Sequence, residues 1–171
     1  MKERPEGVTF MGNPLTLVGD EIKAGVKAPD VEVLDNELAP VKISSFDGKI
    51  VVVSSVPSLD TPVCDTETRR FDDEISKLDF DVEILTISMD LPFAQKRWCG
   101  AAHAKKVKTL SDYRDASFGT SYGVLIKELR LLARAVFVLD KGRIVRYVQL
   151  IKEITNEPDY NEVLSAVKEL R

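Results

Sequence analysis

The sequence predicts an α/β fold in which helices cover both faces of a mixed β-sheet. Its 171 residues suit one compact domain, which we expect to span residues 1–171. Between residues 50 and 122, β-branched apolar runs alternate with segments of helical periodicity. Two later apolar runs, at 135–139 and 144–150, are joined by the turn Asp140-Lys141-Gly142-Arg143 and indicate a hairpin. Early alternation and a late hairpin together predict a sheet with both parallel and antiparallel strands.

The first expected element is a β-hairpin at residues 8–18, placed as an appendage ahead of the main domain. Two apolar runs, Val8-Thr9-Phe10 and Leu15-Thr16-Leu17-Val18, flank the segment Met11-Gly12-Asn13-Pro14. Short strands are expected at 31–34 and 41–43. The turn Phe46-Asp47-Gly48-Lys49 then leads into the β-branched run Ile50 to Val56, where we expect the core to begin.

A helix is expected from Pro62 to Leu78, because Phe71, Ile75 and Leu78 recur at helical spacing. The later elements continue the alternation to the end of the chain. We expect a strand at 82–88, a helix at 92–104, a strand near 109–110, a short helix at 117–122, strands at 135–139 and 144–150, and a helix at 160–170.

Composition excludes several classes of function. The 24 Lys and Arg against 28 Asp and Glu give a net charge of −4, which does not suit a nucleic-acid binder. No stretch approaches the roughly 18 apolar residues of a membrane helix, and the amino terminus has no apolar signal core. We therefore expect a cytoplasmic protein that binds neither nucleic acid nor membrane. One His and two Cys are too few for a four-ligand zinc site, so no metal is expected.

Cys64 is the leading candidate for a nucleophile. It follows the strand 50–56 and falls at the start of the next helix, with Thr61 as N-cap, Pro62 at the first helical position and Cys64 at the third. Backbone N–H groups and the helix dipole stabilise a thiolate there. Asp60, Asp65 and Glu67 oppose its formation, so a cation is needed from elsewhere in the chain.

Arg134 is the best candidate for that cation. If the two-residue period of the strand 135–139 extends back to it, Arg134 shares a buried face with Val136 and Val138. In an α/β sheet it could then reach the turn that holds Cys64 and favour the thiolate. Alternatively, Arg134 lies at the strand edge and pairs with an Asp or Glu.

Cys99 and His103 are weaker candidates. The chain has no Cys-x-x-Cys motif, which argues against a dithiol reductase of the thioredoxin type. A distant second thiol suits a scheme in which Cys64 becomes a sulfenic acid and Cys99 condenses with it. Alternatively, Cys99 is a small buried residue beside Trp98. His103 could act with a cysteine, or could simply be solvated or cap a helix.

The segment Pro57-Ser58-Leu59-Asp60-Thr61-Pro62-Val63-Cys64 resembles the active-site signature of peroxiredoxins. Further segments across nearly the whole chain resemble the bacterial thiol peroxidase subfamily of that family. They are Phe10-Met11-Gly12-Asn13-Pro14, residues 88–95, Arg97-Trp98-Cys99-Gly100, Leu132-Ala133-Arg134-Ala135 and residues 153–160.

This resemblance implies a thioredoxin-like fold, a homodimer, and reduction of hydrogen peroxide or alkyl hydroperoxides with thioredoxin as electron donor. It implies that Cys64 is the peroxidatic cysteine and Cys99 the resolving cysteine, joined in an intramolecular disulfide. Thr61 and Arg134 would orient the peroxide, and Pro57 would shield the pocket. No haem, flavin or metal cofactor is implied.

Two other functions compete with this one. The first is a cysteine hydrolase or acyl transferase that uses Cys64 with His103. The second is a non-catalytic thioredoxin-like binding module whose cysteines are buried.

Overall fold

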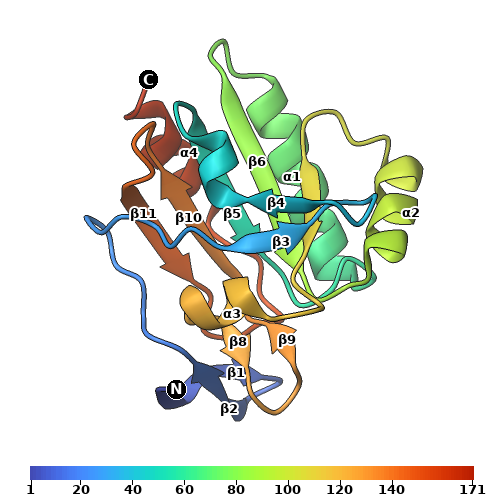
Figure 1. Cartoon of the computed structure of the whole chain (residues 1–171), viewed down its shortest axis with the longest axis vertical. Helices are drawn as coiled ribbons and strands as arrows, with labels where there is room; N and C mark the ends of the chain where they lie inside the picture. The colour runs from blue at the N-terminus through green and yellow to red at the C-terminus, as the bar shows by residue number, and fades with distance from the viewer.

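The centre of the protein is a seven-stranded sheet, described here from a computed structural model of all 171 residues (Figure 1). The strand order is β11-β10-β5-β6-β7-β3-β4. The strands are β3 (Glu32–Leu34), β4 (Pro40–Lys42), β5 (Ile50–Ser55), β6 (Val82–Ser88), β7 (Lys108–Ser111), β10 (Ala135–Leu139) and β11 (Val145–Leu150). A short 3₁₀ helix, η1 (Ile43–Phe46), precedes β5.

The mixed character of the sheet is confirmed. The three central strands β5, β6 and β7 run parallel, whereas β10 is antiparallel to both β5 and β11. Every residue of β5 and β6 is buried, as expected for parallel strands covered on both faces. Because β10 pairs directly with β5, the residues that precede β10 lie beside the carboxyl end of β5, with Ala135 opposite Ser55.

Two hydrophobic cores fill the opposite faces of the sheet. Ile50 and Val52 point into one core, where they meet residues of α1 (Pro62–Ser76), α2 (Pro92–Ala102) and α4 (Tyr160–Lys168). Val51 and Val53 point into the other, where the short helix α3 (Ser117–Ser121) packs. The period of two along β5 thus explains why both faces are covered.

The amino-terminal hairpin is part of the second core rather than an appendage. β1 (Glu3–Phe10) and β2 (Asn13–Val18) join β8 (Leu125–Ile126) and β9 (Leu131–Leu132) in a four-stranded sheet of order β1-β2-β8-β9. Val8 and Leu17 have no exposed surface. The sequence does not indicate β8 and β9, because two residues are too few to show a period.

Three helices end two residues before the position expected from the sequence. α1 ends at Ser76, α2 at Ala102 and α4 at Lys168. His103 ends α2 because it adopts a left-handed conformation, with φ of 51°. The carboxylate of Asp72, on α1, then accepts the backbone N–H groups of residues 105–107 and ties down the following loop. No helix combines the length and apolar character needed to cross a membrane.

Candidate active site

The candidate site lies at the carboxyl end of β5, where the chain turns into α1. Thr61 is the N-cap residue, Pro62 follows it and Cys64 occupies the third helical position, as the sequence predicts. The Thr61 side chain does not cap the helix, however. Its hydroxyl donates to the carbonyl of Ser58 at 2.9 Å, which leaves the hydroxyl lone pairs free to accept.

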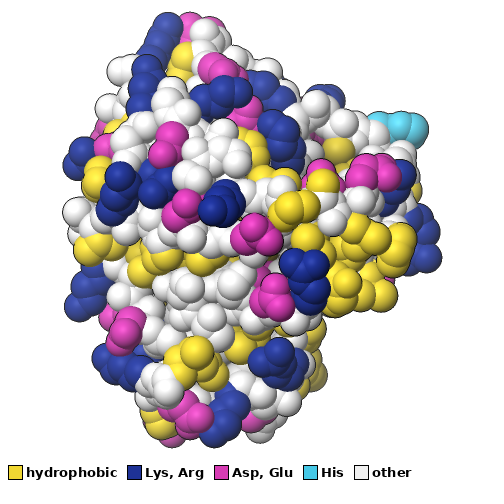
Figure 2. Space-filling view, viewed as in Figure 1, with side chains coloured by type: hydrophobic (Ala, Val, Ile, Leu, Met, Phe, Trp, Pro, Cys, Tyr) yellow, Lys and Arg dark blue, Asp and Glu magenta, His cyan; other side chains and the backbone are white.

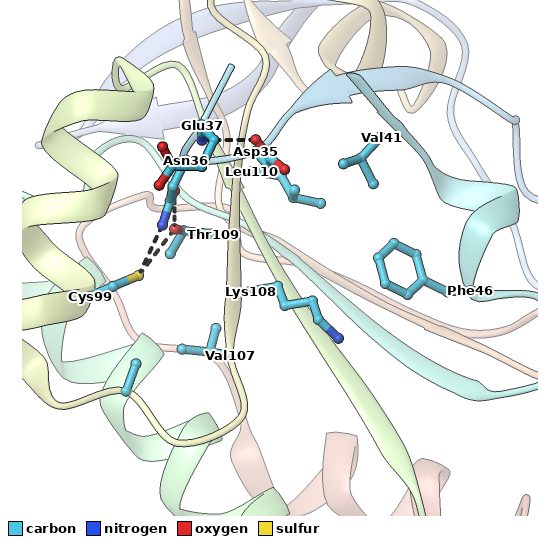
Figure 3. Close-up of a pocket in the computed structure, with 11 residues that line it drawn as sticks. Asp35, Asn36, Glu37, Val41, Phe46, Cys99, Val107, Lys108, Thr109 and Leu110 are labelled. Atoms are coloured by element: carbon cyan, nitrogen blue, oxygen red, sulfur yellow. Dashed lines mark hydrogen bonds between the residues drawn. The ribbon is translucent and has the colours of Figure 1, made fainter. Parts of the chain in front are cut away.

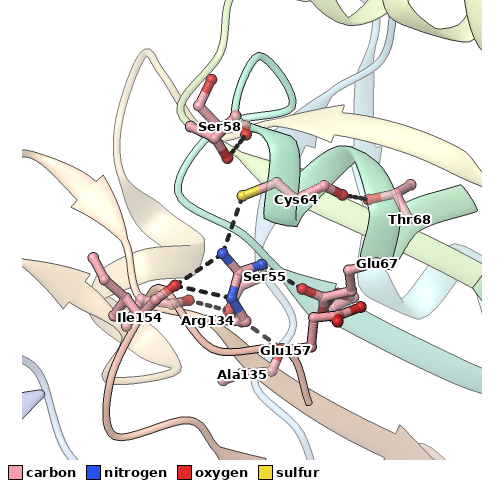
Figure 4. Close-up of polar contacts among 12 residues, drawn as sticks. Ser55, Ser58, Cys64, Glu67, Thr68, Arg134, Ala135, Ile154 and Glu157 are labelled. Carbon is pink, nitrogen blue, oxygen red and sulfur yellow. Dashed lines mark hydrogen bonds and ion pairs between the residues drawn. The ribbon is translucent and has the colours of Figure 1, made fainter. Parts of the chain in front are cut away.

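The structure places Arg134 against Cys64 (Figure 4). Nη2 of Arg134 lies 3.3 Å from Sγ of Cys64, and both side chains are buried. Arg134 reaches this position because it directly precedes β10, which runs beside β5. The guanidinium therefore places a positive charge and an N–H donor directly against the sulfur.

Arg134 also forms an ion pair with Glu67. The second carboxylate oxygen of Glu67 accepts the hydroxyl of Ser54 at 2.9 Å. Burial raises the pKa of Glu67, while Arg134 and Ser54 act against that rise. Burial also disfavours the charged form of Arg134, but Glu67 and Cys64 outweigh it and raise the Arg134 pKa. Arg134 therefore contacts the thiol, as one alternative expects, and it also pairs with an acid, but it does so in the core rather than at a strand edge.

Glu67 has a partner that the sequence did not predict. The sequence placed it only among the carboxylates near Cys64, whereas the structure shows that it pairs with Arg134. Glu67 lies three residues after Cys64, and therefore on the same face of α1 as Phe71 and Ile75. An acidic residue inside a buried helical face is the signal that could have identified it.

The loop before the helix is held by Asp90. Its carboxylate accepts the Ser58 hydroxyl at 2.6 Å, the Leu59 backbone N–H at 2.8 Å and the Ser88 hydroxyl at 2.6 Å. Pro57, at the head of this loop, is buried. Because Ser58 also accepts from Thr61, Asp90 fixes the backbone that carries the Thr61 hydroxyl. Sequence reasoning did not single out Asp90.

Cys99 lies on α2, and its sulfur points toward Thr109 of β7 (Figure 3). The Cys99 thiol is half-buried and lies 3.2 Å from the hydroxyl of Thr109 and 3.8 Å from Nδ2 of Asn36. It borders a cavity of about 500 Å³. Both cysteines are free thiols in this structure.

His103 does not join the site. It is exposed at the end of α2, and the single histidine of the chain projects from the surface in Figure 2. No hydrogen bond connects His103 with Cys64, whose sulfur contacts Arg134 instead. The cysteine–histidine pair that a hydrolase would need is absent.

The fold and the site together define a thiol-based redox protein, and comparison with known proteins agrees. The family model described as Redoxin matches residues 23–164. The thiol peroxidase of Halalkalibacterium halodurans is 55% identical over 161 residues, which cover 94% of this chain and 96% of that protein. The thiol peroxidase of Bacillus subtilis is 54% identical, with coverage of 95% and 97%.

Solved structures agree with the fold. The crystal structure of a peroxiredoxin-like protein from Aquifex aeolicus superposes with a TM-score of 0.90 at 45% identity, covering 97% of this chain and 98% of that one. The chain belongs to the redoxin family and, within it, to the bacterial thiol peroxidase subfamily of the peroxiredoxins. The thioredoxin-like fold in its peroxiredoxin variant is confirmed, and the activity is that of a thiol-dependent peroxidase.

Proposed function

We propose that Cys64 is the residue that attacks the peroxide. The observation that carries this proposal is the contact between the buried Cys64 sulfur and the Arg134 guanidinium. The thiolate attacks one oxygen of the peroxide along the O–O bond. The new S–O bond converts Cys64 to a sulfenic acid, and the O–O bond breaks to release an alkoxide or hydroxide that takes up a proton.

Three groups assist this step. Arg134 stabilises the charge that moves from sulfur to the departing oxygen. The free backbone N–H groups at the start of α1 stabilise the same charge. The Thr61 hydroxyl, which donates to Ser58, offers its lone pairs to a peroxide O–H. Pro57 is buried at the head of the loop and shields the pocket from water.

Cys99 acts second in this scheme. Its thiol condenses with the sulfenic acid of Cys64, which forms an intramolecular disulfide and releases water. The disulfide then takes two electrons and two protons from an external dithiol, for which we propose thioredoxin. Since the two sulfurs face different neighbours in the reduced protein, the disulfide needs a change in the helices that carry them.

The substrates in this proposal are hydrogen peroxide and alkyl hydroperoxides, in the cytoplasm. We further propose that the protein is a homodimer. Support for an interface comes from apolar side chains at the start of α2, where Leu91 is 50% exposed and Phe93 65% exposed. Apolar surface of this kind gathers on the α2 side of the molecule in Figure 2.

Stopped-flow fluorescence tests the proposal directly, because Trp98 is the only tryptophan in the chain and directly precedes Cys99. Mixing the reduced protein with hydrogen peroxide should give a fast phase for oxidation of Cys64 and a slower phase for disulfide formation. The fast phase should depend linearly on peroxide concentration. A fluorescence trace that does not change with peroxide, with both thiols still free afterwards, would contradict the proposal.

A further inference from the structure

Two segments that the mechanism above does not use meet each other in the structure. They are the tip of the β1–β2 hairpin and the segment at 152–155, from opposite ends of the chain. The carboxylate of Glu153 joins them. One of its oxygens accepts the backbone N–H of Gly12 at 2.8 Å and the Thr9 hydroxyl at 3.1 Å. The other accepts the backbone N–H and the hydroxyl of Thr155, at 3.1 and 2.8 Å.

Two backbone hydrogen bonds join the hairpin to the residues on either side of Glu153. The N–H of Thr9 donates to the carbonyl of Lys152 at 2.7 Å, and the N–H of Ile154 donates to the carbonyl of Thr9 at 2.9 Å. Glu153 therefore lies in the middle of a two-bond bridge between the hairpin and the 152–155 segment. The backbone N–H groups of Gly12 and Thr155 lower the pKa of Glu153 to about 2, so it is ionised throughout the physiological range.

The bridge leads directly to the active site through Ile154. Its carbonyl accepts from two nitrogens of Arg134, Nε at 3.1 Å and Nη2 at 2.9 Å. Nη2 is the same nitrogen that contacts Sγ of Cys64 (Figure 4). Two donors on one acceptor fix the plane of the guanidinium, and the position of that acceptor is fixed by the hairpin.

We propose that Glu153 is a positioning residue for the peroxide reaction, which it assists by clamping the hairpin to the Ile154 carbonyl that orients Arg134. This proposal rests on the function proposed above, in which Arg134 assists the attack by Cys64. A guanidinium held in place before the reaction costs no reorganisation when charge moves in the transition state. In a loosened clamp, Arg134 keeps its pairing with Glu67 but loses the second anchor that sets its plane.

The test compares Glu153→Ala with a matched control, Glu128→Ala, at a residue that lies between β8 and β9 and also bonds to the hairpin. Glu128 also accepts a hairpin N–H, that of Thr16 at 2.9 and 3.1 Å, but no hydrogen bond connects it with Ile154 or Arg134. We expect Glu153→Ala to lower the second-order rate of Cys64 oxidation by hydrogen peroxide about tenfold, the equivalent of one lost hydrogen bond. Glu128→Ala should leave that rate unchanged. If Glu153→Ala does not fold, Glu153→Gln keeps one acceptor oxygen and should show a smaller loss in the same direction.

A second arm separates positioning from a general structural role. Arg134→Lys keeps the charge beside Glu67 but lacks the planar fork that Ile154 orients. In an Arg134→Lys background, Glu153→Ala should cause no further loss of rate, whereas a merely structural effect would be additive. Equal losses in both backgrounds, or an equal loss from Glu128→Ala, would overturn the inference. If Arg134→Lys itself leaves the rate unchanged, the plane of the guanidinium does not matter and the inference about Glu153 is overturned, whereas a wild-type rate in Arg134→Ala would overturn the proposed role of Arg134.

Discussion

The indole N–H of Trp98 donates to the carboxylate of Asp65 at 2.7 Å. Each partner is adjacent in sequence to one of the two cysteines, so this bond ties the first turn of α1 to α2 beside both of them. Nε of Arg69 donates to the same oxygen of Asp65 at 2.8 Å. The bond directs Trp98 toward α1 and leaves the Cys99 sulfur facing β7. It therefore stabilises the reduced arrangement, in which the two sulfurs face different neighbours.

The first prediction concerns the cation at Cys64. Arg134→Ala should slow the oxidation of Cys64 by hydrogen peroxide about a hundredfold, the usual order for loss of a donor that stabilises transition-state charge. Alkylation by iodoacetamide at pH 7 should slow as well, because the variant lacks the positive charge beside the attacking sulfur. Stopped-flow fluorescence and mass spectrometry measure the two rates. Wild-type rates in the variant would show that the 3.3 Å contact has no catalytic effect.

The second prediction concerns the different roles of the two cysteines in the reaction. Cys64→Ser should abolish peroxide consumption, because it removes the attacking sulfur. Cys99→Ser should consume one equivalent of peroxide at the wild-type rate and then stop, with Cys64 held as sulfenic acid. A sulfenic-acid-specific probe such as dimedone reads out the difference. The assignment fails if both variants lose the first oxidation step equally.

The sequence predicts most of the fold because its long elements have clear periods. β5 and β6 are buried throughout, α1 buries one face, and each element was expected within a few residues. The small sheet is different. β8 and β9 have two residues each, and they are held by pairing of β8 with β2 of the hairpin and of β9 with β8 rather than by local propensity. Contacts between distant segments, such as that between Thr9 and Glu153, leave no periodic pattern in the sequence.

The candidate site shows the same contrast. Cys64 and Thr61 lie in one short segment that the strand-to-helix pattern locates, and the resemblance to peroxiredoxins adds Pro57 just before them. The contact of Arg134 with Cys64 was one of two alternatives from the sequence, because a charged residue next to an apolar strand needs a partner but the strand does not say which. The carbonyl of Ile154 could not be predicted, because a backbone acceptor has no residue type to mark it.

The third prediction concerns Glu67. Glu67→Gln should lower the free energy of unfolding by about 3 kcal/mol, because it leaves the buried Arg134 without its anion. Oxidation of Cys64 should slow too, since Gln does not hold the guanidinium as firmly. Urea denaturation and stopped-flow fluorescence give the two quantities.

Glu83→Gln is the matched control for Glu67→Gln. Glu83 is 9% exposed and pairs with Lys49 and Lys108, at the end of the sheet away from Cys64. It should destabilise the protein less, because both lysines are half-exposed, and it should leave the oxidation rate unchanged. Slower oxidation in Glu83→Gln would mean that the Glu67 effect reflects general destabilisation.

The fourth prediction concerns pH and Glu153. Hydrogen bonds from the Gly12 and Thr155 backbones lower the Glu153 pKa from 4.5 to about 2 in the folded protein. A lowered carboxyl pKa contributes stability that is present above the unfolded value and is lost as the pH falls through the folded value. The difference in unfolding free energy between wild type and Glu153→Gln should therefore be largest above pH 4.5 and should shrink toward pH 2. Urea titrations across this range measure it, and a difference that is constant with pH would contradict the assignment.

The last prediction concerns the motion that brings the two cysteines together. A disulfide requires Cα atoms within roughly 7 Å, with sulfurs that face each other. Rotation of Cys99 away from Thr109 and toward α1 displaces the neighbouring Trp98, so the bond to Asp65 has to break. The oxidised protein should then show faster amide hydrogen exchange at 60–68 and 95–103 than the reduced protein, with β5 and β6 unchanged. Gly100 favours the second segment as the site of opening, because glycine is a poor helix former.

Asp65→Ala isolates the bond to Trp98 as the barrier to this motion. It should speed disulfide formation after the first oxidation, because the restraint on α2 is gone, and it should leave the first oxidation unchanged. Arg69→Ala is the control, since it removes the Asp65–Arg69 ion pair and keeps the Trp98 bond. Rapid quenching followed by counting of free thiols measures the rate of the second step in both variants. Equal rates in Asp65→Ala, Arg69→Ala and wild type would show that the Trp98 bond does not limit disulfide formation.

Identical hydrogen exchange in the two redox states, or disulfides only between chains on non-reducing gels, would exclude the motion itself.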